Sequence, residues 1–374
     1  MIYLDNAATS YPKPKSVLDE ITRCLKFYCG NPGRSSHKLS LAAADKIYEA
    51  RESIAGFLQY EKSENIIFVP SATFGLNMVI KGLVTKECHC IISDLEHNSV
   101  IRPLAKTLKK LSGSISVFDS NLTLKEAIIP LIKKDTRLVI STLCSNVTGK
   151  IINFKELSQI CRSNNLKLII DASQYLGHIQ LDLKDSYFTA ICCAGHKNLF
   201  GIQGSAFTVI NDAELFDTLL EGGTGIDTFS DEMPIMLPER YEAGTMPTPA
   251  IVSLGKGINF INEVGMDQIE KALSKHTNIL RNELTEIRNL TLYGADNGIA
   301  AFNLKNIHSS YISKALDKYG ICTRSGFHCA PLIHKKMGTE AIGAIRVSLS
   351  YFNTETDIYK LVNALKKIQK EDSI

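Results

Sequence analysis

Short runs of apolar residues alternate with amphipathic stretches from about residue 65 to residue 210. Seven of the runs predict buried strands, at residues 65–69, 89–93, 114–118, 137–142, 166–171, 188–193 and 206–210. Apolar residues at helical spacing predict helices between most of these strands, at residues 73–84, 98–110, 123–134 and 154–164. Nearly continuous apolar strands separated by amphipathic helices are typical of a mostly parallel sheet with both faces covered. We therefore predict an α/β fold whose large domain contains a mostly parallel seven-stranded sheet.

The segments on either side of this sheet differ from it in composition. Residues 1–14 are irregular and polar, and helices are predicted at residues 16–28 and 39–57. Four of the eleven prolines lie between Met233 and Pro249, which is typical of a connection between domains. The rest predicts a smaller α+β domain, with helices at residues 262–287, 309–318 and 354–370 and strands at residues 300–304 and 344–349. We therefore expect an N-terminal arm that joins the small domain (1–14), a large domain (15–250) and a small C-terminal domain (251–374).

The overall composition excludes several classes of protein. The formal net charge of +3 is too small to indicate a nucleic-acid partner, and no apolar run is long enough to cross a membrane. Ten cysteines without a secretory signal indicate reduced thiols and a cytoplasmic location. Cys88-His89-Cys90 does not predict a metal site, because neighbouring residues of a strand point to opposite faces. We expect no bound metal.

A lysine follows one of the buried strands. Gly195, His196 and Lys197 come directly after the apolar run that ends near residue 193. Poor hydration at such a position lowers the pKa of an amine and makes it a candidate nucleophile. This amine can form a Schiff base with a carbonyl cofactor such as pyridoxal phosphate. The alternative is an ordinary surface lysine in a turn between two strands.

Other polar residues also follow predicted strands, where ligands bind in sheets of this kind. Asp171 ends an apolar strand, and its carboxylate can pair with a protonated pyridine nitrogen; the alternative is a helix N-cap. Gln174 lies three residues further on and can reach an oxygen of the same ring. His97 follows another strand and can stack on a flat cofactor, although a lone histidine is more often an ordinary polar loop residue.

The stretch Pro70-Ser71-Ala72-Thr73 joins a predicted strand to a predicted helix. Free backbone N–H groups at a helix start, together with hydroxyl groups, bind phosphate. The alternative is a simple N-cap, at which serine and threonine are common.

A glycine-containing loop, Arg324 to Pro331, places Cys329 beside His328 and five residues from Arg324. Positively charged neighbours favour the thiolate form of a cysteine, and a loop position lets the thiol move towards a substrate. The alternative is an incidental cysteine, since the chain has ten. Arg346 is a charge within an apolar strand and needs an anion, which is either a substrate carboxylate or a structural salt-bridge partner.

Together, these residues and motifs resemble those of the cysteine desulfurases in the class V aminotransferase family. The resemblance covers nearly the whole chain, and the order and spacing of its motifs are specific. It rests on Tyr3-Leu4-Asp5-Asn6-Ala7-Ala8-Thr9, Arg34-Ser35-Ser36-His37, Glu96-His97, Ser145-Asn146-Val147-Thr148-Gly149, Asp171-Ala172-Ser173-Gln174, Gly195-His196-Lys197, Glu242-Ala243-Gly244-Thr245 and Arg324 through Ala330. The Arg-x-Gly-x-x-Cys-Ala form resembles the branch that includes sulfur-mobilisation desulfurases and selenocysteine lyases.

The resemblance implies a pyridoxal 5'-phosphate enzyme of fold type I that acts as a homodimer. Its expected reaction converts L-cysteine to L-alanine and leaves a persulfide on Cys329 for transfer to an acceptor protein. The resemblance implies that Lys197 carries the cofactor, and that the ring is held by Asp171, Gln174 and His97. The cofactor phosphate is expected to contact Ala72, Thr73, His196 and, from a partner subunit, Thr245. The substrate is expected to contact Asn146, Arg346, Arg324, Arg34 and His37.

Three departures from the family pattern bear on these expectations. Ala194 stands where a serine is frequent, so one phosphate-binding hydroxyl is missing, and Phe327 replaces a frequent second histidine. The span from Cys329 to Arg346 is also longer than in the best-known members. The alternatives are a selenocysteine lyase, an aminotransferase or C–S lyase in which Cys329 is incidental, and a sulfur-carrier scaffold without turnover.

Overall fold

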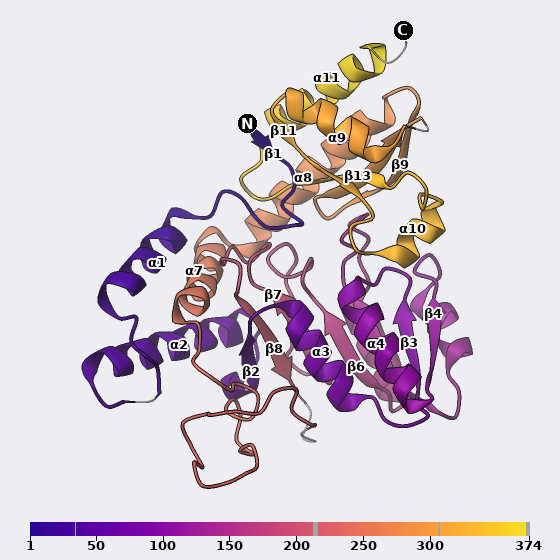
Figure 1. The fold of residues 1–374 in the computed structure, drawn as a ribbon. Coiled ribbons are helices and arrows are strands. Elements are labelled where there is room, and N and C mark those ends of the chain that lie inside the picture. Colours follow the sequence, from indigo (N-terminus) through magenta and orange to yellow (C-terminus); the bar gives the residue numbers. More distant parts are fainter. Residues whose placement is uncertain (34, 212–215, 306, 372–374) are drawn as a thin grey trace.

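A seven-stranded sheet in the order β2-β8-β7-β6-β5-β3-β4 forms the centre of the larger part of the computed structural model (Figure 1). The structure describes residues 1–33, 35–211, 216–305 and 307–371. The strands are β2 (Ile66–Val69), β3 (His89–Ser93), β4 (Ser114–Phe118), β5 (Thr136–Thr142), β6 (Lys167–Asp171), β7 (Ala190–Ala194) and β8 (Ala206–Ile210). β4, β3, β5, β6 and β7 pair in parallel, while β8 and β2 run antiparallel to their neighbours. The predicted α/β fold with a mostly parallel sheet is confirmed.

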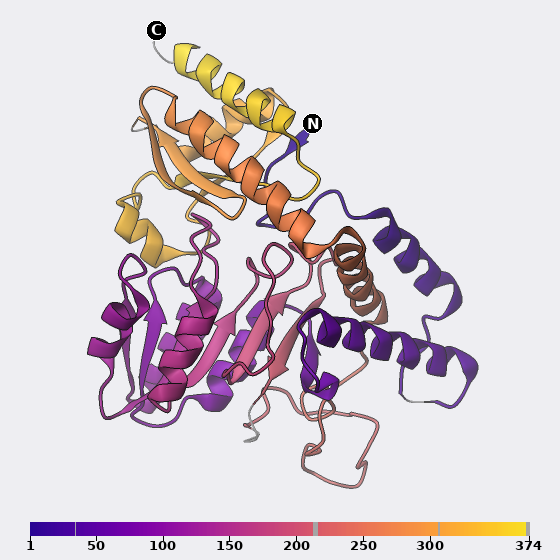
Figure 2. The ribbon, with the colours of Figure 1, turned by 180° about the vertical axis from the view of Figure 1, so that it is seen from behind.

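Helices cover both faces of this sheet. α3 (Ala72–Leu83) and α4 (Asn98–Leu111) lie on one face, and α5 (Leu124–Ile128) and α6 (Phe154–Ser163) lie on the other (Figures 1 and 2). Successive strand residues belong to different apolar clusters: Ile169 packs in one and Ile170 in the other. This division explains why the inner strands read as nearly continuous apolar runs, since every residue of a strand with two covered faces is buried; β4, at the sheet edge, is mostly exposed.

The predicted helix at residues 123–134 is shorter than expected. α5 ends at Ile128, and a single 3-10 turn over Ile129–Leu131 follows it. Pro130 lies inside this turn and has no backbone N–H group to continue an α-helix.

The C-terminal part contains a four-stranded antiparallel sheet in the order β12-β13-β10-β9. Its strands are β9 (Leu290–Asp296), β10 (Ile299–Leu304), β12 (Arg324–Gly326) and β13 (Ala344–Ser348), and the helices around it are α8 (Met266–Thr285), α9 (Ser309–Lys318), α10 (Pro331–Met337) and α11 (Glu355–Glu371). The predicted helix at residues 262–287 is confirmed for residues 266–285, which form α8, but its first residues belong to a separate helix that was not predicted. The chain forms α7 (Thr248–Val264) and then α8, separated by Gly265 at φ +92°, a backbone angle that an α-helix cannot contain.

The N-terminal arm lies against the C-terminal part (Figure 1). β1 (Ile2–Tyr3) pairs in parallel with β11 (Ile321–Cys322), and Asp5 forms a bridge with Ser348. The arm then leads to α1 (Lys15–Phe27) and α2 (Lys38–Phe57), which pack on α7. The division into domains stays a prediction. Within the described residues, no helix is both long enough and apolar enough to span a membrane.

Candidate active site

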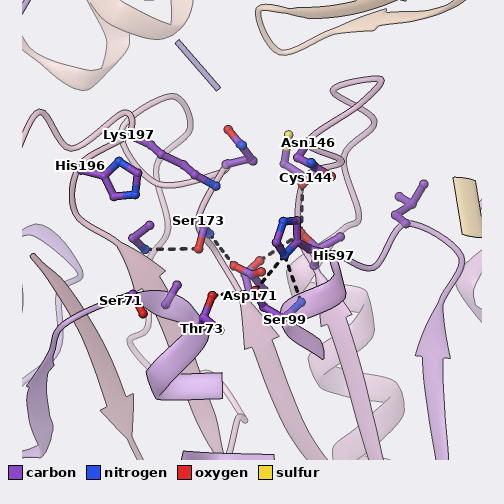
Figure 3. A pocket seen from close by; sticks show the side chains of 15 residues that line it. Ser71, Thr73, His97, Ser99, Cys144, Asn146, Asp171, Ser173, His196 and Lys197 are labelled. Carbon is purple, nitrogen blue, oxygen red and sulfur yellow. Dashed lines mark hydrogen bonds between the residues drawn. The ribbon is translucent and has the colours of Figure 1, made fainter. Parts of the chain in front are cut away.

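A cavity of about 200 Å³ lies at the carboxyl ends of strands β3, β5, β6 and β7, beside the starts of α3 and α4 (Figure 3). Eight of the residues expected to contact the cofactor or the substrate line it: Ala72, Thr73, His97, Asn146, Asp171, Gln174, His196 and Lys197. The position follows from the topology, because the carboxyl ends of parallel strands meet at one edge of the sheet.

Lys197 reaches the cavity from the turn that follows β7 (Figure 3). Gly195 allows this turn, because a Cβ there would lie 2.6 Å from Ser205 Oγ and 2.9 Å from its carbonyl oxygen. Burial lowers the pKa of Lys197, and the Asp171 carboxylate opposes this shift. The amine makes no hydrogen bond or ion pair with the described part of the chain. It is therefore a lysine of reduced basicity that is free to react.

The N-terminal arm fixes the backbone next to this lysine. The carbonyl oxygen of His196 accepts hydrogen bonds from Ser10 N (3.1 Å), Thr9 Oγ1 (3.0 Å) and Lys13 Nζ (2.8 Å). Burial, with smaller effects from Lys197 and Lys13, lowers the pKa of His196 to about 4. Its ring is therefore neutral at physiological pH, and Nδ1 has no partner in the described structure.

Asp171 and Gln174 lie at the end of β6. Asp171 Oδ1 accepts a hydrogen bond from Ser173 N at 2.9 Å and so caps a turn; no helix follows, and the alternative of a helix N-cap is wrong. Gln174 Nε2 donates to the carbonyl oxygen of Ala7 at 2.8 Å, which leaves its Oε1 buried without a described partner. A buried oxygen of this kind costs free energy unless a ligand donates to it.

His97 caps α4 and belongs to a short chain of hydrogen bonds. Its Nδ1 accepts from Ser99 N at 3.1 Å, which places the ring proton on Nε2. Burial lowers the pKa of His97, and the nearby Lys197 lowers it further. Ser99 Oγ lies 2.8 Å from Thr73 Oγ1 and so links the starts of α3 and α4. Sequence reasoning missed Ser99, although a serine two residues after a capping histidine at a helix start was an available signal.

Glu96, next to His97, forms hydrogen bonds that join the ends of β3 and β5. Its Oε1 accepts a hydrogen bond from Thr142 N at 2.8 Å and another from the Ser93 hydroxyl. Burial raises the pKa of Glu96 to about 8, so this carboxyl is largely protonated at neutral pH. The Glu96-His97 pair thus combines a residue that joins β3 to β5 with a residue that lines the cavity.

The start of α3 supplies the third side of the cavity. Ser71 Oγ caps the helix by accepting from Phe74 N at 3.2 Å, and Ala72 and Thr73 follow as the first helical residues. The N–H groups of a first helical turn have no partner within the helix, so they favour an anion. The cap and the anion-binding interpretations are compatible here.

Arg346 lies beside the cavity and already has an anionic partner. Its Nη2 lies 2.7 Å from Asp5 Oδ1, and its Nη1 donates to the carbonyl oxygen of Asn146 at 3.0 Å. The side chain is almost fully buried, and its Nε has no described partner. The salt bridge that we considered as the alternative is therefore present, while Nε remains free for a further acceptor.

The Cys329 loop is attached to the rim of this cavity. Asn98 N donates to the carbonyl oxygen of Cys329 at 2.7 Å, and Asn146 Nδ2 donates to that of His328 at 2.7 Å. His328 and Cys329 both adopt left-handed backbone angles, with φ of 49° and 55°, and the thiol is exposed. Non-glycine residues in this region mark a conformation that its surroundings hold in place.

The expectation that His328 adds positive charge beside Cys329 is wrong. The ring is buried, and its Nδ1 lies 3.2 Å from Nε2 of His334. Burial, followed by the charge of Arg346 and the contact with His334, lowers the pKa of His328 to about 2. Arg324, the exposed first residue of β12, remains the positive residue of this loop.

The structure does not bring the remaining candidates into the cavity. Thr245 lines a different cavity, together with Phe68, Phe74 and Tyr241. His37 is exposed and caps α2, and Arg34 lies outside the described residues. Cys144 and Ser173 also line the main cavity. Cys144 was not singled out and Ser173 was quoted only within a motif, because only the fold shows which side chains of neighbouring loops face inwards.

Comparisons with known proteins agree with this architecture. The family model for aminotransferase class-V matches residues 2–361. A probable cysteine desulfurase of Methanothermobacter thermautotrophicus is 31% identical over 380 residues, covering 98% of this chain and 94% of its own. A cysteine desulfurase of Salmonella agona is 29% identical over 388 residues, covering 99% and 94%. The apo structure of a cysteine desulfurase from Thermococcus onnurineus superposes with a TM-score of 0.90 at 27% identity, covering 99% and 95%. The fold is therefore that of these enzymes.

Proposed function

Because the chain belongs to the aminotransferase class-V family, we propose that it is a pyridoxal-phosphate-dependent cysteine desulfurase. The proposal is that it converts L-cysteine to L-alanine and keeps the sulfur as a persulfide on Cys329. The observation that carries it is the attachment of the exposed Cys329 loop to the rim of the cavity that Lys197 enters. A second nucleophile at this position is what sulfur extraction needs beyond an amine and a carboxylate.

The residues of the cavity fit pyridoxal phosphate. Three buried polar atoms of cavity residues have no described partner: Gln174 Oε1, Asn146 Oδ1 and His196 Nδ1. Lys197 supplies an amine for the carbonyl group, Asp171 a carboxylate for the pyridine nitrogen, and the start of α3 unpaired N–H groups for the phosphate. We propose that the hydroxyls of Ser99 and Ser173, which line the same cavity, compensate for the missing hydroxyl at Ala194.

The cofactor, when bound, withdraws electrons from the substrate Cα and weakens the bonds around it. The chain then has three tasks. Lys197 Nζ, whose pKa burial lowers, accepts and returns protons. Asn146, together with Arg346 through its free Nε, orients the substrate carboxylate. The neutral His97 ring, which lines the same cavity, would pack on the ring of the bound cofactor.

Cys329 performs the step that defines the reaction. Its thiolate forms an S–S bond with the substrate sulfur as the C–S bond breaks. The electron pair of that bond goes to the substrate carbon, which takes up a proton. Cysteine and an enzyme thiol thus become alanine and an enzyme persulfide, so atoms and electrons balance without an external oxidant or reductant.

Several finer points belong to the same proposal. We propose a homodimer in which Thr245 of one subunit reaches the phosphate site of the other, since Thr245 does not line the cavity of its own chain. An acceptor protein then takes the sulfur. A cytoplasmic location is consistent with ten free thiols.

The test compares Cys329→Ser with Cys29→Ser, a change at another exposed cysteine. Both proteins should bind pyridoxal phosphate and show its visible absorption. Cys329→Ser should form no alanine from cysteine, whereas Cys29→Ser should match the wild type. Mass spectrometry should find a persulfide on Cys329 of the wild type after one turnover. Full alanine formation by Cys329→Ser would overturn the proposal.

A further inference from the structure

α10 (Pro331–Met337) lies within the span between Cys329 and Arg346. It begins at Pro331, two residues after Cys329, and lies between the C-terminal part and the ends of β3 and β4 (Figure 1). Ala330 N donates to the carbonyl oxygen of Phe327, so the cysteine loop and the helix are joined by a tight turn. Contacts that fix the position of α10 therefore also fix the position of the Cys329 loop.

Lys336, in the last turn of α10, forms ion pairs with two aspartates at the end of the large sheet. Its Nζ lies 2.5 Å from Asp94 Oδ2 and also pairs with Asp119 Oδ1. Asp94 follows β3 and Asp119 follows β4, so both carboxylates lie at the edge of the sheet where the cavity opens. These ion pairs connect positions 242 and 217 residues apart in the chain.

The two pairs differ in exposure. The Asp94 side chain is 11% exposed and also accepts a hydrogen bond from Ser120 N, whereas Asp119 is 49% exposed. The Lys336 side chain is 27% exposed. Ion pairs that are partly shielded from water keep more of their attraction than pairs on the open surface. The ion pair with Asp94 therefore contributes more than the pair with Asp119 to holding α10 against the large sheet.

α10 also has apolar contacts, since the buried Ile333 and the partly buried Met337 pack in the cluster that contains Ile345 and Val347. Leu332 packs against the apolar cluster on the α3–α4 face, but it is only partly buried. His334 is fully buried and bonds to Thr339 and His328, which belong to the same segment. Lys336 is thus the described residue of α10 that makes a charged contact with the large sheet.

We propose that Lys336 is a positioning residue that holds the Cys329 loop at the cavity rim through its ion pairs with Asp94 and Asp119. This proposal rests on the proposed role of Cys329, because the loop matters only if its thiol must meet the substrate. When the pairs break, α10 and the loop move away from Asn98, and the persulfide can reach an acceptor. When they form, the thiol is held where the substrate sulfur arrives.

The test uses amide hydrogen exchange and turnover of the same holoenzyme variants. Lys336→Gln removes the charge, Lys336→Arg keeps it, and Lys335→Gln is the matched control, since Lys335 is an exposed neighbour without an ion pair in the described structure. In Lys336→Gln, exchange at Asn98 and in the loop should rise about fivefold, and kcat for cysteine should fall by about the same factor with a smaller change in KM. Lys336→Arg and Lys335→Gln should resemble the wild type.

Salt gives an independent readout. At about 1 M KCl, where the screening length is roughly 3 Å, exchange at Asn98 should rise in the wild type and change little in Lys336→Gln. If Lys336→Gln fails to fold, Asp94→Asn serves as the second variant, because it removes the stronger pair without altering α10. Unchanged exchange at Asn98 in both variants would overturn the proposal. A wild type without desulfurase activity whose exchange still responds to Lys336 would refute only the proposed function.

Discussion

The side-chain amide of Asn146 donates a hydrogen bond to the backbone carbonyl oxygen of His328 at 2.7 Å, across 182 positions of the chain. Asn146 lines the cavity, and His328 precedes the exposed Cys329. One side chain therefore both faces the proposed substrate and holds the loop that carries the proposed nucleophile.

Asn146→Asp should disturb both roles. The carboxylate cannot donate to the His328 carbonyl, and a buried acceptor without a partner costs about 1–3 kcal/mol. We expect kcat/KM for cysteine to fall about tenfold or more. Steady-state alanine formation measures this, and Asn121→Asp is the control, because that exposed residue already accepts from Lys150. An unaltered kcat/KM would show that the hydrogen bond has no part in turnover.

L-Selenocysteine should separate the proposed activity from its closest alternative. Selenium leaves carbon more readily than sulfur does, so its removal has less need of an attacking thiolate. Cys329→Ser should therefore lose alanine formation from cysteine and keep part of it from selenocysteine. A wild type active with selenocysteine alone would identify a lyase. Pyruvate or a keto acid from the serine variant would instead indicate a C–S lyase or an aminotransferase.

Mixing two inactive variants should restore activity if the site is shared between subunits. Lys197→Ala removes the amine, and Thr245→Ala removes the hydroxyl expected from the partner. A heterodimer of the two has one site in which both residues are intact. Activity should appear after subunit exchange and stay absent when each variant is exchanged with itself. Verified exchange without recovered activity would argue for sites built within one chain.

The buried Arg51–Glu242 pair should contribute strongly to stability. Both side chains are 7% exposed and are joined at 2.9 and 3.0 Å, and Glu242 also accepts from Phe68 N. Removing one partner of such a pair leaves a buried charge and costs about 3–5 kcal/mol. Arg51→Met should therefore lower the melting temperature clearly, whereas Lys46→Met, which breaks the exposed pair with Glu49, should change it little. Equal effects would mean that burial does not decide the strength of these pairs.

His178 should make the fold sensitive to acid. Burial lowers its pKa to about 4 from the ordinary 6.5, so between these values the unfolded chain binds a proton that the folded chain does not. The free energy of unfolding should then fall as pH decreases through this window, by about 1.4 kcal/mol per pH unit from this residue, and be insensitive to it above pH 6.5. Urea midpoints of His178→Gln should show a shallower slope. The exposed His308→Asn variant should keep the wild-type slope; identical slopes in all three proteins would contradict the assignment.

Local pattern was sufficient to predict the large sheet. The strands 89–93, 114–118 and 206–210 lie at the predicted residues. Every residue of β3 and β8 is buried, whereas β4 is an edge strand in which only Phe118 is buried. β9 was missed because it alternates apolar and polar residues irregularly, and only Ala295 in it is buried. The break at Gly265 was missed because a glycine inside an apolar helical pattern does not by itself show whether the helix continues.

Site residues that directly follow a strand could be predicted from the sequence. The surroundings of residues whose partners lie far away in the chain could not. Lys197, Asp171 and His97 were found because strand ends of a parallel sheet meet. The environment of Arg346 stayed open in the sequence, since its partner Asp5 lies 341 positions away. The neutrality of His328 was not predictable either, because it depends on burial beside His334 and near Arg346.

The position of the N-terminal arm has a consequence for synthesis. Its first strand and Asp5 pair with β11 and Ser348, so this arm cannot take its final position until residues synthesised much later have left the ribosome. Closing a loop of this size has a high entropic cost until the large sheet has shortened the distance between its ends. Because the same arm binds the carbonyl next to Lys197, the reactive lysine cannot acquire its final surroundings during elongation. A nascent chain arrested before Ala344 should therefore expose residues 1–13 to protease, and the finished protein should protect them.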